Sequence, residues 1–391
     1  MGPAFSPLDE ELQLLPGNLS PNLAEGLTRL GLWMPFWRAR EALNALTGAR
    51  VSEATARRET LAAGAALEAL EAKAVDLLEA EAPAASATAA RWLQVSVDGA
   101  MVPLVGGDWA EARTLVVAQL RCGDGNALEA RDLSYFSRMT DHASFSRLAT
   151  METHRRGVEL AETVIAVNDG AEWIQEFLDI HCPDAVRILD WAHASGYVHA
   201  AGHAVFGETC GEWCGTQLRV LRHGEPVTLL LELVRLEDTL DENDPARATV
   251  AQSLTYLAKR LDQIQYATFA RLGYPIGSGI VESANRTVVQ SRLKGAGMHW
   301  AATSVNPLLA LRSVACSDRW DEFWPAIAGQ LRHADRHRRH CRRQERAARS
   351  CPQQAQEPPP ARPPMFVDGH PTKDHPWNRR PAIRRRHRAK L

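Results

Sequence analysis

The stretch Leu93–Gly99, LQVSVDG, alternates apolar and polar residues until it reaches an aspartate and a glycine. Because side chains point to opposite sides along a strand, Leu93, Val95 and Val97 share one face. The stretch therefore predicts a β-strand with one buried face and a carboxylate, Asp98, at its end.

Two further carboxylates lie at the boundaries of predicted elements. Asp169 follows the apolar run Val164–Val167, and Glu282 opens a helical stretch after the turn Gly277–Gly279. Mg²⁺ prefers carboxylate oxygens, and two-metal phosphodiester chemistry holds its ions about 3.5–4 Å apart. We therefore expect Asp98, Asp169 and Glu282 to be catalytic residues that hold two Mg²⁺ or Mn²⁺ ions.

The elements predicted after residue 90 follow the order β-β-β-α-β-α-β-α. The expected strands are Leu93–Asp98, Thr114–Leu120, Leu128–Phe136, Val164–Val167 and Ala185–Leu189, and the expected helices are Ala143–Leu160, Ala171–His181 and one that begins near Ala192. Three successive strands followed by βα units predict an α/β fold with a mixed sheet. The order is that of the RNase H-like topology, in which the first and fourth strands are neighbours, so Asp98 and Asp169 are expected to lie close together.

The chain divides by composition into five predicted regions. They are an N-terminal helical domain (1–90), a first catalytic part (91–201), a helical insertion (202–272), a second catalytic part (273–330) and a basic, proline-rich, disordered tail (331–391). The tail holds 17 Lys and Arg against 5 Asp and Glu, which leaves 28 basic and 42 acidic residues before it, out of totals of 45 and 47. A basic tail of this kind typically meets a polyanion or stays disordered.

The N-terminal region contains two short helical segments, Pro35–Leu46 and Ser52–Ala63, with Ser52 as the expected N-cap. Arg57 and Arg58 lie one turn into the second segment. This arrangement predicts a helix-turn-helix with DNA-binding arginines, although an ordinary helical hairpin has the same pattern.

Composition excludes several classes of protein. No apolar run approaches 18 residues, so a membrane span is not expected. The start of the chain lacks the pattern of a signal peptide, and seven scattered cysteines are typical of reduced thiols, which favours a cytoplasmic protein.

Each carboxylate also has an ordinary structural interpretation. An aspartate before a glycine is common in turns, and Asp169 could cap the helix that begins near Ala171. Glu282 and Arg286 could form a surface ion pair at i,i+4 spacing. The joint order of the three carboxylates on the expected elements favours catalysis.

Five motifs carry a resemblance to a known family. They are VSVDGAMVPL (95–104), VNDGAEW (167–173), ILDWAHA (188–194), YPIGSGIVESANR (274–286) and RLKGAGMHW (292–300). The chain resembles a bacterial insertion-sequence transposase of the DDE class, ISKra type, distantly similar to Mutator-like transposases. The resemblance covers about Phe5 to Trp324, and His375–Trp377 also fits it. A cysteine-rich N-terminal element found on some transposases is missing, and Gly295 and His299 stand where more basic character is expected.

The resemblance implies an RNase H-like fold with a helical insertion before the glutamate, and a triad of Asp98, Asp169 and Glu282. It implies Mg²⁺-dependent cleavage at transposon ends and strand transfer by a freed 3′-hydroxyl. The expected partners are double-stranded DNA, as terminal inverted repeats and target DNA, and further copies of the chain in a homo-oligomer on the nucleoid.

Asp190 and His193 match a [Cys/Asp]-x-x-His motif that follows the second catalytic aspartate in related transposases. We assign them a supporting role, and Asp190 stays open as a rival of Asp169 for the second metal ligand. Arg286, Arg292 and Lys294 follow Glu282 and are expected to contact DNA phosphates, although a solvated helix face explains them equally well.

Three functions remain open from the sequence. The first is a DDE transposase that cuts and joins DNA. The second is an RNase H-like nuclease that cuts without joining. The third is a DNA-binding regulator whose α/β domain is inert.

Overall fold

The computed structural model describes residues 14–16, 19–81, 90–123, 127–350 and 365–373 of the chain. Residues up to Asp335 form one compact unit, and residues from Arg336 onward form a second. No helix within the described residues is both long enough and apolar enough to cross a membrane.

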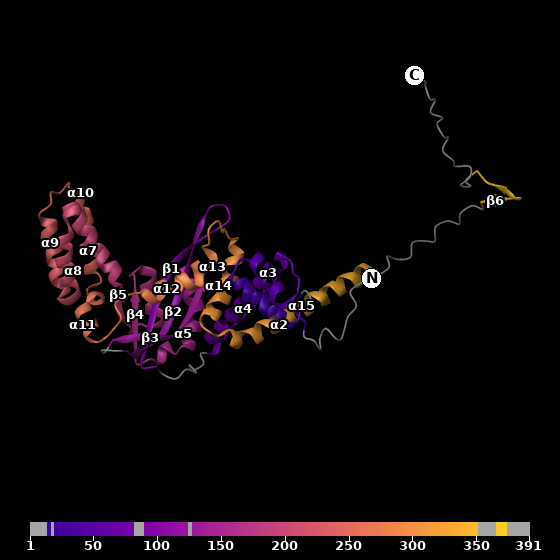
Figure 1. The fold of residues 1–391 in the computed structure, drawn as a ribbon, viewed down its shortest axis with the longest axis horizontal. Coiled ribbons are helices and arrows are strands. Elements are labelled where there is room, and N and C mark those ends of the chain that lie inside the picture. The colour runs from indigo at the N-terminus through magenta and orange to yellow at the C-terminus, as the bar shows by residue number, and fades with distance from the viewer. Residues whose placement is uncertain (1–13, 17–18, 82–89, 124–126, 351–364, 374–391) are drawn as a thin grey trace, which may run out of the picture. The chain divides into compact units, whose positions relative to one another are not determined.

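Five strands form one mixed sheet in the order β3-β2-β1-β4-β5 (Figure 1). They are β1 (Trp92–Pro103), β2 (Trp109–Cys122), β3 (Leu128–Arg138), β4 (Thr163–Asn168) and β5 (Val186–Leu189). β1 and β3 each pair antiparallel with β2, whereas β4 is parallel to both β1 and β5. The expected mixed α/β fold is confirmed, and its elements follow the expected order.

The two faces of β1 divide as the alternation predicts. Leu93, Val95 and Val97 are buried against helices α5 (His142–Arg155) and α6 (Glu172–His181). The opposite face carries the buried polar residue Ser96 and is covered by helix α12 (Gly279–Ala284), which packs on Val116 of β2. Asp98 lies two residues beyond Ser96 and therefore shares the α12 face.

β1 is longer than the sequence predicts, because it continues through Asp98 to Pro103. Ala100 and Val102 are buried in a core formed with distant helices, and this burial keeps the strand extended. Pairing with β4, however, ends at Val95. Asp98 is thus inside a strand rather than at its end, but it lies just past the parallel ladder.

The helix expected at Ala143–Leu160 is shorter in the structure. Gly157 adopts a left-handed backbone with φ of 64°, which ends α5. A 3₁₀ turn, η2 (Val158–Leu160), then leads into β4.

The segment between β5 and α12 forms a bundle at one end of the first unit (Figure 1). It comprises α7 (Trp191–Phe206), η3 (Gly207–Thr209), α8 (Gly211–His223), α9 (Pro226–Asp238), α10 (Pro245–Ala258), η4 (Leu261–Ile264) and α11 (Tyr266–Arg271). Val198, Leu229 and Leu257 share a core with Ile165 and Ile188 of the sheet. The bundle therefore packs against the sheet at β4 and β5 through a shared hydrophobic core.

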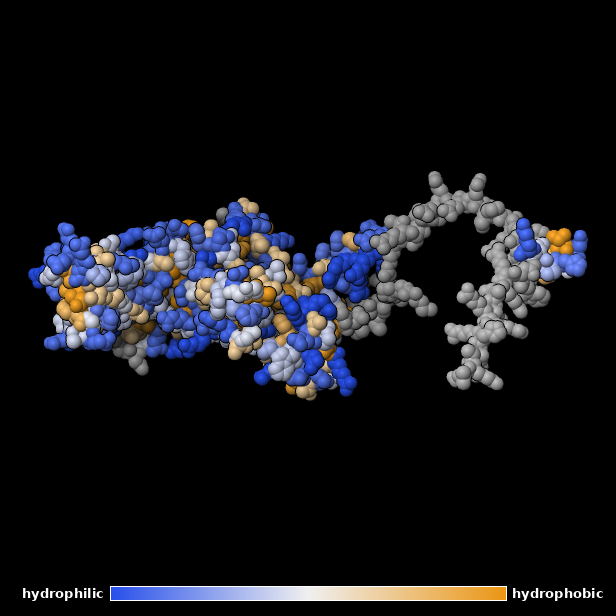
Figure 2. All heavy atoms as spheres, turned by 90° about the horizontal axis from the view of Figure 1, so that it is seen from above, coloured by the Kyte–Doolittle hydropathy of each residue, from blue (hydrophilic) through white to orange (hydrophobic). Residues whose placement is uncertain are grey.

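The surface of the bundle includes a patch of exposed apolar residues. Val227, Leu231 and Val234 of α9 are exposed at helical spacing. Hydrophobic residues gather at this end of the first unit in Figure 2, on a surface that is otherwise mostly polar.

In the described part of the chain before the sheet lie three helices: α2 (Pro21–Trp33), α3 (Phe36–Thr47) and α4 (Glu53–Glu81). Gly48 ends α3 with a φ of 73°. The expected cap of α4 is confirmed, because Ser52 Oγ accepts a hydrogen bond from Thr55 N at 3.0 Å. α4 runs past Ala63, where the expected segment ends, and continues to Glu81.

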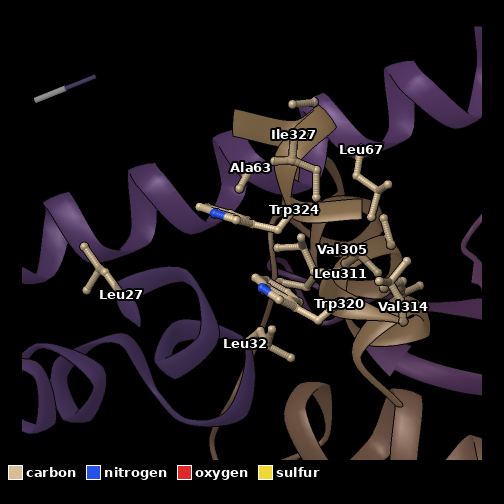
Figure 3. Close-up of a cluster of buried hydrophobic side chains, with 14 of the residues drawn as sticks. Leu27, Leu32, Ala63, Leu67, Val305, Leu311, Val314, Trp320, Trp324 and Ile327 are labelled. Atoms are coloured by element: carbon tan, nitrogen blue, oxygen red, sulfur yellow. The ribbon is translucent and has the colours of Figure 1, made fainter. Parts of the chain in front are cut away.

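The N-terminal helices share a core with two helices from the end of the first unit, α14 (Ala302–Cys316) and α15 (Trp320–Ser350). Figure 3 shows part of this cluster: Leu27, Leu32, Ala63, Leu67, Val305, Leu311, Val314, Trp320, Trp324 and Ile327. Gly64 lies so close to Pro307 that a Cβ there would come within 2.1 Å of the proline main-chain oxygen. The N-terminal helices therefore do not form a compact unit of their own.

Between the helix that carries Glu282 and α14, the chain forms a π-helix, η5 (Asn285–Gln290), and one turn of helix, α13 (Ser291–Leu293). Arg312 of α14 donates hydrogen bonds to the main-chain oxygens of Thr287 and Val288 in the π-helix. π-helical turns are rare and occur often at functional sites.

The start of the tail differs from the prediction of disorder, because α15 runs to Ser350. Residues 331–350 contain no glycine or proline and hold eight arginines and three alanines, which favour a helix. Farther on, β6 (Phe366–Val367) and β7 (His370–Pro371) pair as a short antiparallel ladder. Arg384–Arg388 and His375–Trp377 lie outside the described residues.

Candidate active site

Asp98 and Asp169 occupy neighbouring positions on adjacent parallel strands. The last paired residues of β1 and β4 are Val95 and Ala166. Three residues further along each strand stand Asp98 and Asp169. Neighbouring strands lie roughly 4.7–4.9 Å apart. The register therefore brings the two carboxylates close together, just past the last paired residues of β1 and β4.

Side chains hold β1 and β4 together where the ladder has ended. Asn168 Oδ1 accepts a hydrogen bond from Val97 N at 2.6 Å, and Ser96 Oγ donates to Val167 O at 2.8 Å. Both bonds lie within two residues of the aspartates. The separation of Asp98 from Asp169 is therefore fixed by buried polar contacts.

Asp190 continues the row onto the third parallel strand. Asn168 pairs with Leu189, so Asp169 and Asp190 are the residues that directly follow β4 and β5. Asp190 Oδ1 accepts from Ser278 N at 2.7 Å, and Oδ2 accepts from His193 N and Nδ1, each at 3.1 Å. Both oxygens are thus engaged by protein donors, and Asp190 caps α7.

The hydrogen bonds of Asp190 determine its charge state and that of His193. Burial would raise the pKa of Asp190, but the bonds from His193 and Ser278 outweigh it and lower the pKa to about 2. The bond to Asp190 raises the pKa of His193, and the charges of Asp169 and Asp98 raise it further. This pair therefore favours a carboxylate and an imidazolium beside the site.

The Asp98 carboxyl group experiences opposing effects. Burial is the largest influence and raises its pKa, and the negative charge of Asp169 acts in the same direction. Hydrogen bonds from Gly99 N and Asn285, together with the positive charge of His193, lower it. The net pKa is raised, so positive charge placed between the two aspartates would relieve an unfavourable interaction.

The helical bundle fixes the loop that carries Asp169. Tyr256 Oη donates to Asp169 O at 2.5 Å, and Arg260 Nη2 donates to Gly170 O at 2.6 Å. Asp169 Oδ1 accepts from Ala171 N at 2.9 Å. Ala171 is the N-cap of α6 and has no side-chain cap hydrogen bond, so Asp169 does not cap this helix; one of its carboxylate oxygens instead accepts a hydrogen bond in the turn just before α6.

Glu282 lies on α12, the helix that covers the Asp98 face of the sheet, and its side chain is exposed. Within the described residues, no group of three or more His, Cys, Asp and Glu side chains is arranged to hold a metal ion. The structure thus brings Asp98, Asp169, Asp190 and His193 together, and it places Glu282 on the covering helix without a preformed three-carboxylate cluster.

Asn285 is a site residue that sequence reasoning missed. Its Nδ2 donates to Asp98 Oδ2 at 2.8 Å, and the residue is only 3% exposed. Its Oδ1 is buried and has no hydrogen-bond partner among the described residues. Asn285 follows Glu282 at i,i+3 spacing, so the sequence did contain a signal that the two share one helix face.

The oxygen atoms at the site are suitable ligands for a hard cation. Asp98 and Asp169 supply carboxylate oxygens, and Asn285 adds a buried amide oxygen without a partner among the described residues. An open pocket of about 320 Å³ lies alongside, lined by Ala192, His193, Gly196 and Tyr197 of α7.

Four of the five expected DNA-contacting residues are exposed: Arg57, Arg58, Arg286 and Lys294. Arg58 forms an ion pair with Glu59 at 2.8 Å. The Lys294 ammonium lies 5.5 Å from the centre of the Trp109 ring.

Arg292 differs from its expected role, because it is 2% exposed. Its Nε and Nη2 both donate to Gly31 O at 3.1 Å, and its guanidinium lies against the rings of Phe36 and Trp300. Burial lowers its pKa to about 10. Arg292 joins α13 to α2 and is not positioned to contact a DNA phosphate.

Comparisons with known proteins do not identify the chain. No model of a protein family matches it, and no curated protein matches it significantly.

Proposed function

We propose that this protein is a DDE-class DNA transposase that binds the ends of a mobile element, cleaves phosphodiester bonds and transfers the strands. The observation that carries the proposal is the row of Asp98 and Asp169 at one edge of the central parallel strands. The order β3-β2-β1-β4-β5, with Asp98 on central β1, supports the RNase H-like topology expected from the sequence.

Asp98, Asp169 and Glu282 are the residues that would hold two Mg²⁺ or Mn²⁺ ions. Such ions, when bound, neutralise charge on the phosphate and promote attack by water or a 3′-hydroxyl. Asp98 and Asp169 are already fixed by buried contacts. Glu282 would reach the site from α12, and Asn285, the residue directly after α12, donates a hydrogen bond to Asp98.

Asp169 is a better ligand candidate than its rival Asp190. Both oxygens of Asp190 accept hydrogen bonds from the protein, and its main role is to cap α7 and orient His193. Because Asp190 engages His193 Nδ1, Nε2 is the imidazole atom that can donate to a phosphate oxygen. His193 is 49% exposed, so a DNA backbone can reach it.

DNA would approach the exposed basic residues on α4 and after α12. Arg57, Arg58, Arg286 and Lys294 can neutralise phosphates of the terminal inverted repeats and of target DNA. The basic tail would add affinity that falls as salt rises. We further propose that the protein acts as a homo-oligomer on DNA in the cytoplasm.

A strand-transfer assay tests this function. Purified protein would be mixed with Mg²⁺, a duplex carrying the inverted repeats that flank the coding region, and a target plasmid. Wild type should nick at the repeat ends and join pre-cut ends to the plasmid, whereas D98N, D169N and E282Q should bind the ends without cutting. Cutting without joining would identify a nuclease, and binding without any nicking would identify a regulator.

A further inference from the structure

The side chain of Asn285 is satisfied at one end only. Its Nδ2 donates to Asp98, although 187 residues separate the two in sequence. Its Oδ1 lies buried without a hydrogen-bond partner among the described residues. Buried polar atoms nearly always have partners, and leaving one unpaired costs about 1–3 kcal/mol. An oxygen in this position therefore indicates a contact that forms when a further group enters the site.

The local backbone explains why Asn285 reaches Asp98. Asn285 is the first residue of the π-helix, and Val281 and Ala284 of α12 pack on the sheet just before it. Buried Arg312 secures the following turn, because its Nε donates to Val288 O at 2.6 Å and its Nη2 donates to Ser291 Oγ at 2.7 Å. The amide is thus held beside Asp98 by the fold around it.

The chemistry of the neighbours identifies the missing group. Asp98 and Asp169 are two carboxylates at one sheet edge, and a divalent cation is the group that carboxylates and an amide oxygen bind together.

We propose that Asn285 is a cation ligand of this site: its amide nitrogen holds the Asp98 carboxylate, and its unpaired amide oxygen faces a divalent cation that binds beside Asp98. The proposal rests on the proposed function, because it assumes the same Asp98–Asp169 site. It adds a neutral oxygen ligand to the three carboxylates.

Two substitutions separate a ligand from a merely structural residue. N285L keeps the approximate shape and removes both polar atoms, whereas N285D keeps an oxygen and removes the donor. Mn²⁺ binding to the full chain, without DNA, would be measured by calorimetry. We expect N285L to weaken Mn²⁺ binding about tenfold or more and N285D to retain or tighten it. N44L, on the exposed face of α3, is the matched control and should bind as wild type does.

Thermal unfolding supplies a readout that is independent of activity. Without metal, N285D places a third carboxylate near Asp98 and Asp169 and should melt below wild type. Because a ligand stabilises the state that binds it, Mn²⁺ should raise the melting temperature of N285D by more than that of wild type. Equal loss of Mn²⁺ affinity in N285D and N285L would show that only the donor matters and would overturn the proposal.

The test also distinguishes the failure of this proposal from the failure of the proposed function on which it rests. Wild type that binds no Mn²⁺, or binds it equally well in D98N, would refute the cation site and the proposed transposase chemistry with it. Binding that is lost in D98N but unchanged in N285L would refute the role of Asn285 alone.

Discussion

Arg312 donates a hydrogen bond from Nε to the main-chain oxygen of Val288 over 2.6 Å, in the π-helix that begins at Asn285. Its Nη1 donates to Leu32 O at 2.8 Å in α2, and the residue is 1% exposed. A single guanidinium therefore connects the N-terminal helices to the segment that positions Asn285 against Asp98.

Arg312→Lys should destabilise the protein by about 3 kcal/mol or more. Lysine keeps the charge but cannot reproduce the planar fork, so buried carbonyl oxygens lose their partners. Urea unfolding measures the change. Arg286→Lys, at an exposed position, should stay within about 0.5 kcal/mol of wild type. Equal stability of the two variants would show that the hydrogen bonds of Arg312 contribute little to the stability of the protein.

Gly64→Ala should lower stability by about 1–3 kcal/mol, because its Cβ would meet Pro307 O at 2.1 Å and force α4 away from α14. Gly26→Ala is the matched helical control. Its Cβ would have Leu43 Cδ1 as its nearest neighbour at 3.9 Å, and alanine favours a helix. Thermal unfolding should rank Gly26→Ala at or above wild type and Gly64→Ala below it. The opposite ranking would contradict the close packing.

Asp190→Asn should reduce DNA cutting less than Asp98→Asn or Asp169→Asn. In the proposed mechanism the latter two remove metal ligands, whereas Asp190 orients His193 and caps a helix. We expect roughly 10–100-fold loss for Asp190→Asn, as for other supporting residues, and no measurable cutting for the other two. Single-turnover cleavage of a labelled duplex checks this. Full activity of Asp169→Asn would indicate that Asp190, and not Asp169, is the metal ligand.

The same Asp190→Asn variant should lower the pKa of His193, because it removes the charged partner whose hydrogen bond raises that pKa. An NMR titration of the imidazole measures the shift. In wild type, protonated His193 stabilises the fold below its unfolded pKa of about 6.5, and this contribution disappears as pH rises through the raised folded value. The stability difference between wild type and His193→Gln should shrink over that window. A difference that is constant with pH would refute the linkage.

The sequence predicted the sheet well because the alternation in Leu93–Val97 has a local cause. It could not predict that β1 continues past Asp98, since Ala100 and Val102 are buried by helices from distant parts of the chain. The mixed α/β fold followed from the order of the elements, which needs no knowledge of packing.

The site was less predictable, because the burial of a side chain and its contacts with distant parts of the chain do not follow from the neighbouring sequence. Arg292 and Lys294 are two residues apart and both have basic side chains, but Arg292 is buried against α2 and Lys294 is exposed. Asn285 acquires its role through a partner 187 residues away. The high charge of residues 331–350 is typical of disorder, whereas their helix propensity favours the helix that the structure has there.

The shared core of α4 and α14 has a practical consequence for deletion experiments on this protein. A fragment that starts at residue 91 would leave Val305, Leu308 and Leu311 facing water instead of α2 and α4. Such a fragment should precipitate or require the missing piece in trans. Helices α2, α3 and α4 therefore act as a scaffold for the rest of the first unit.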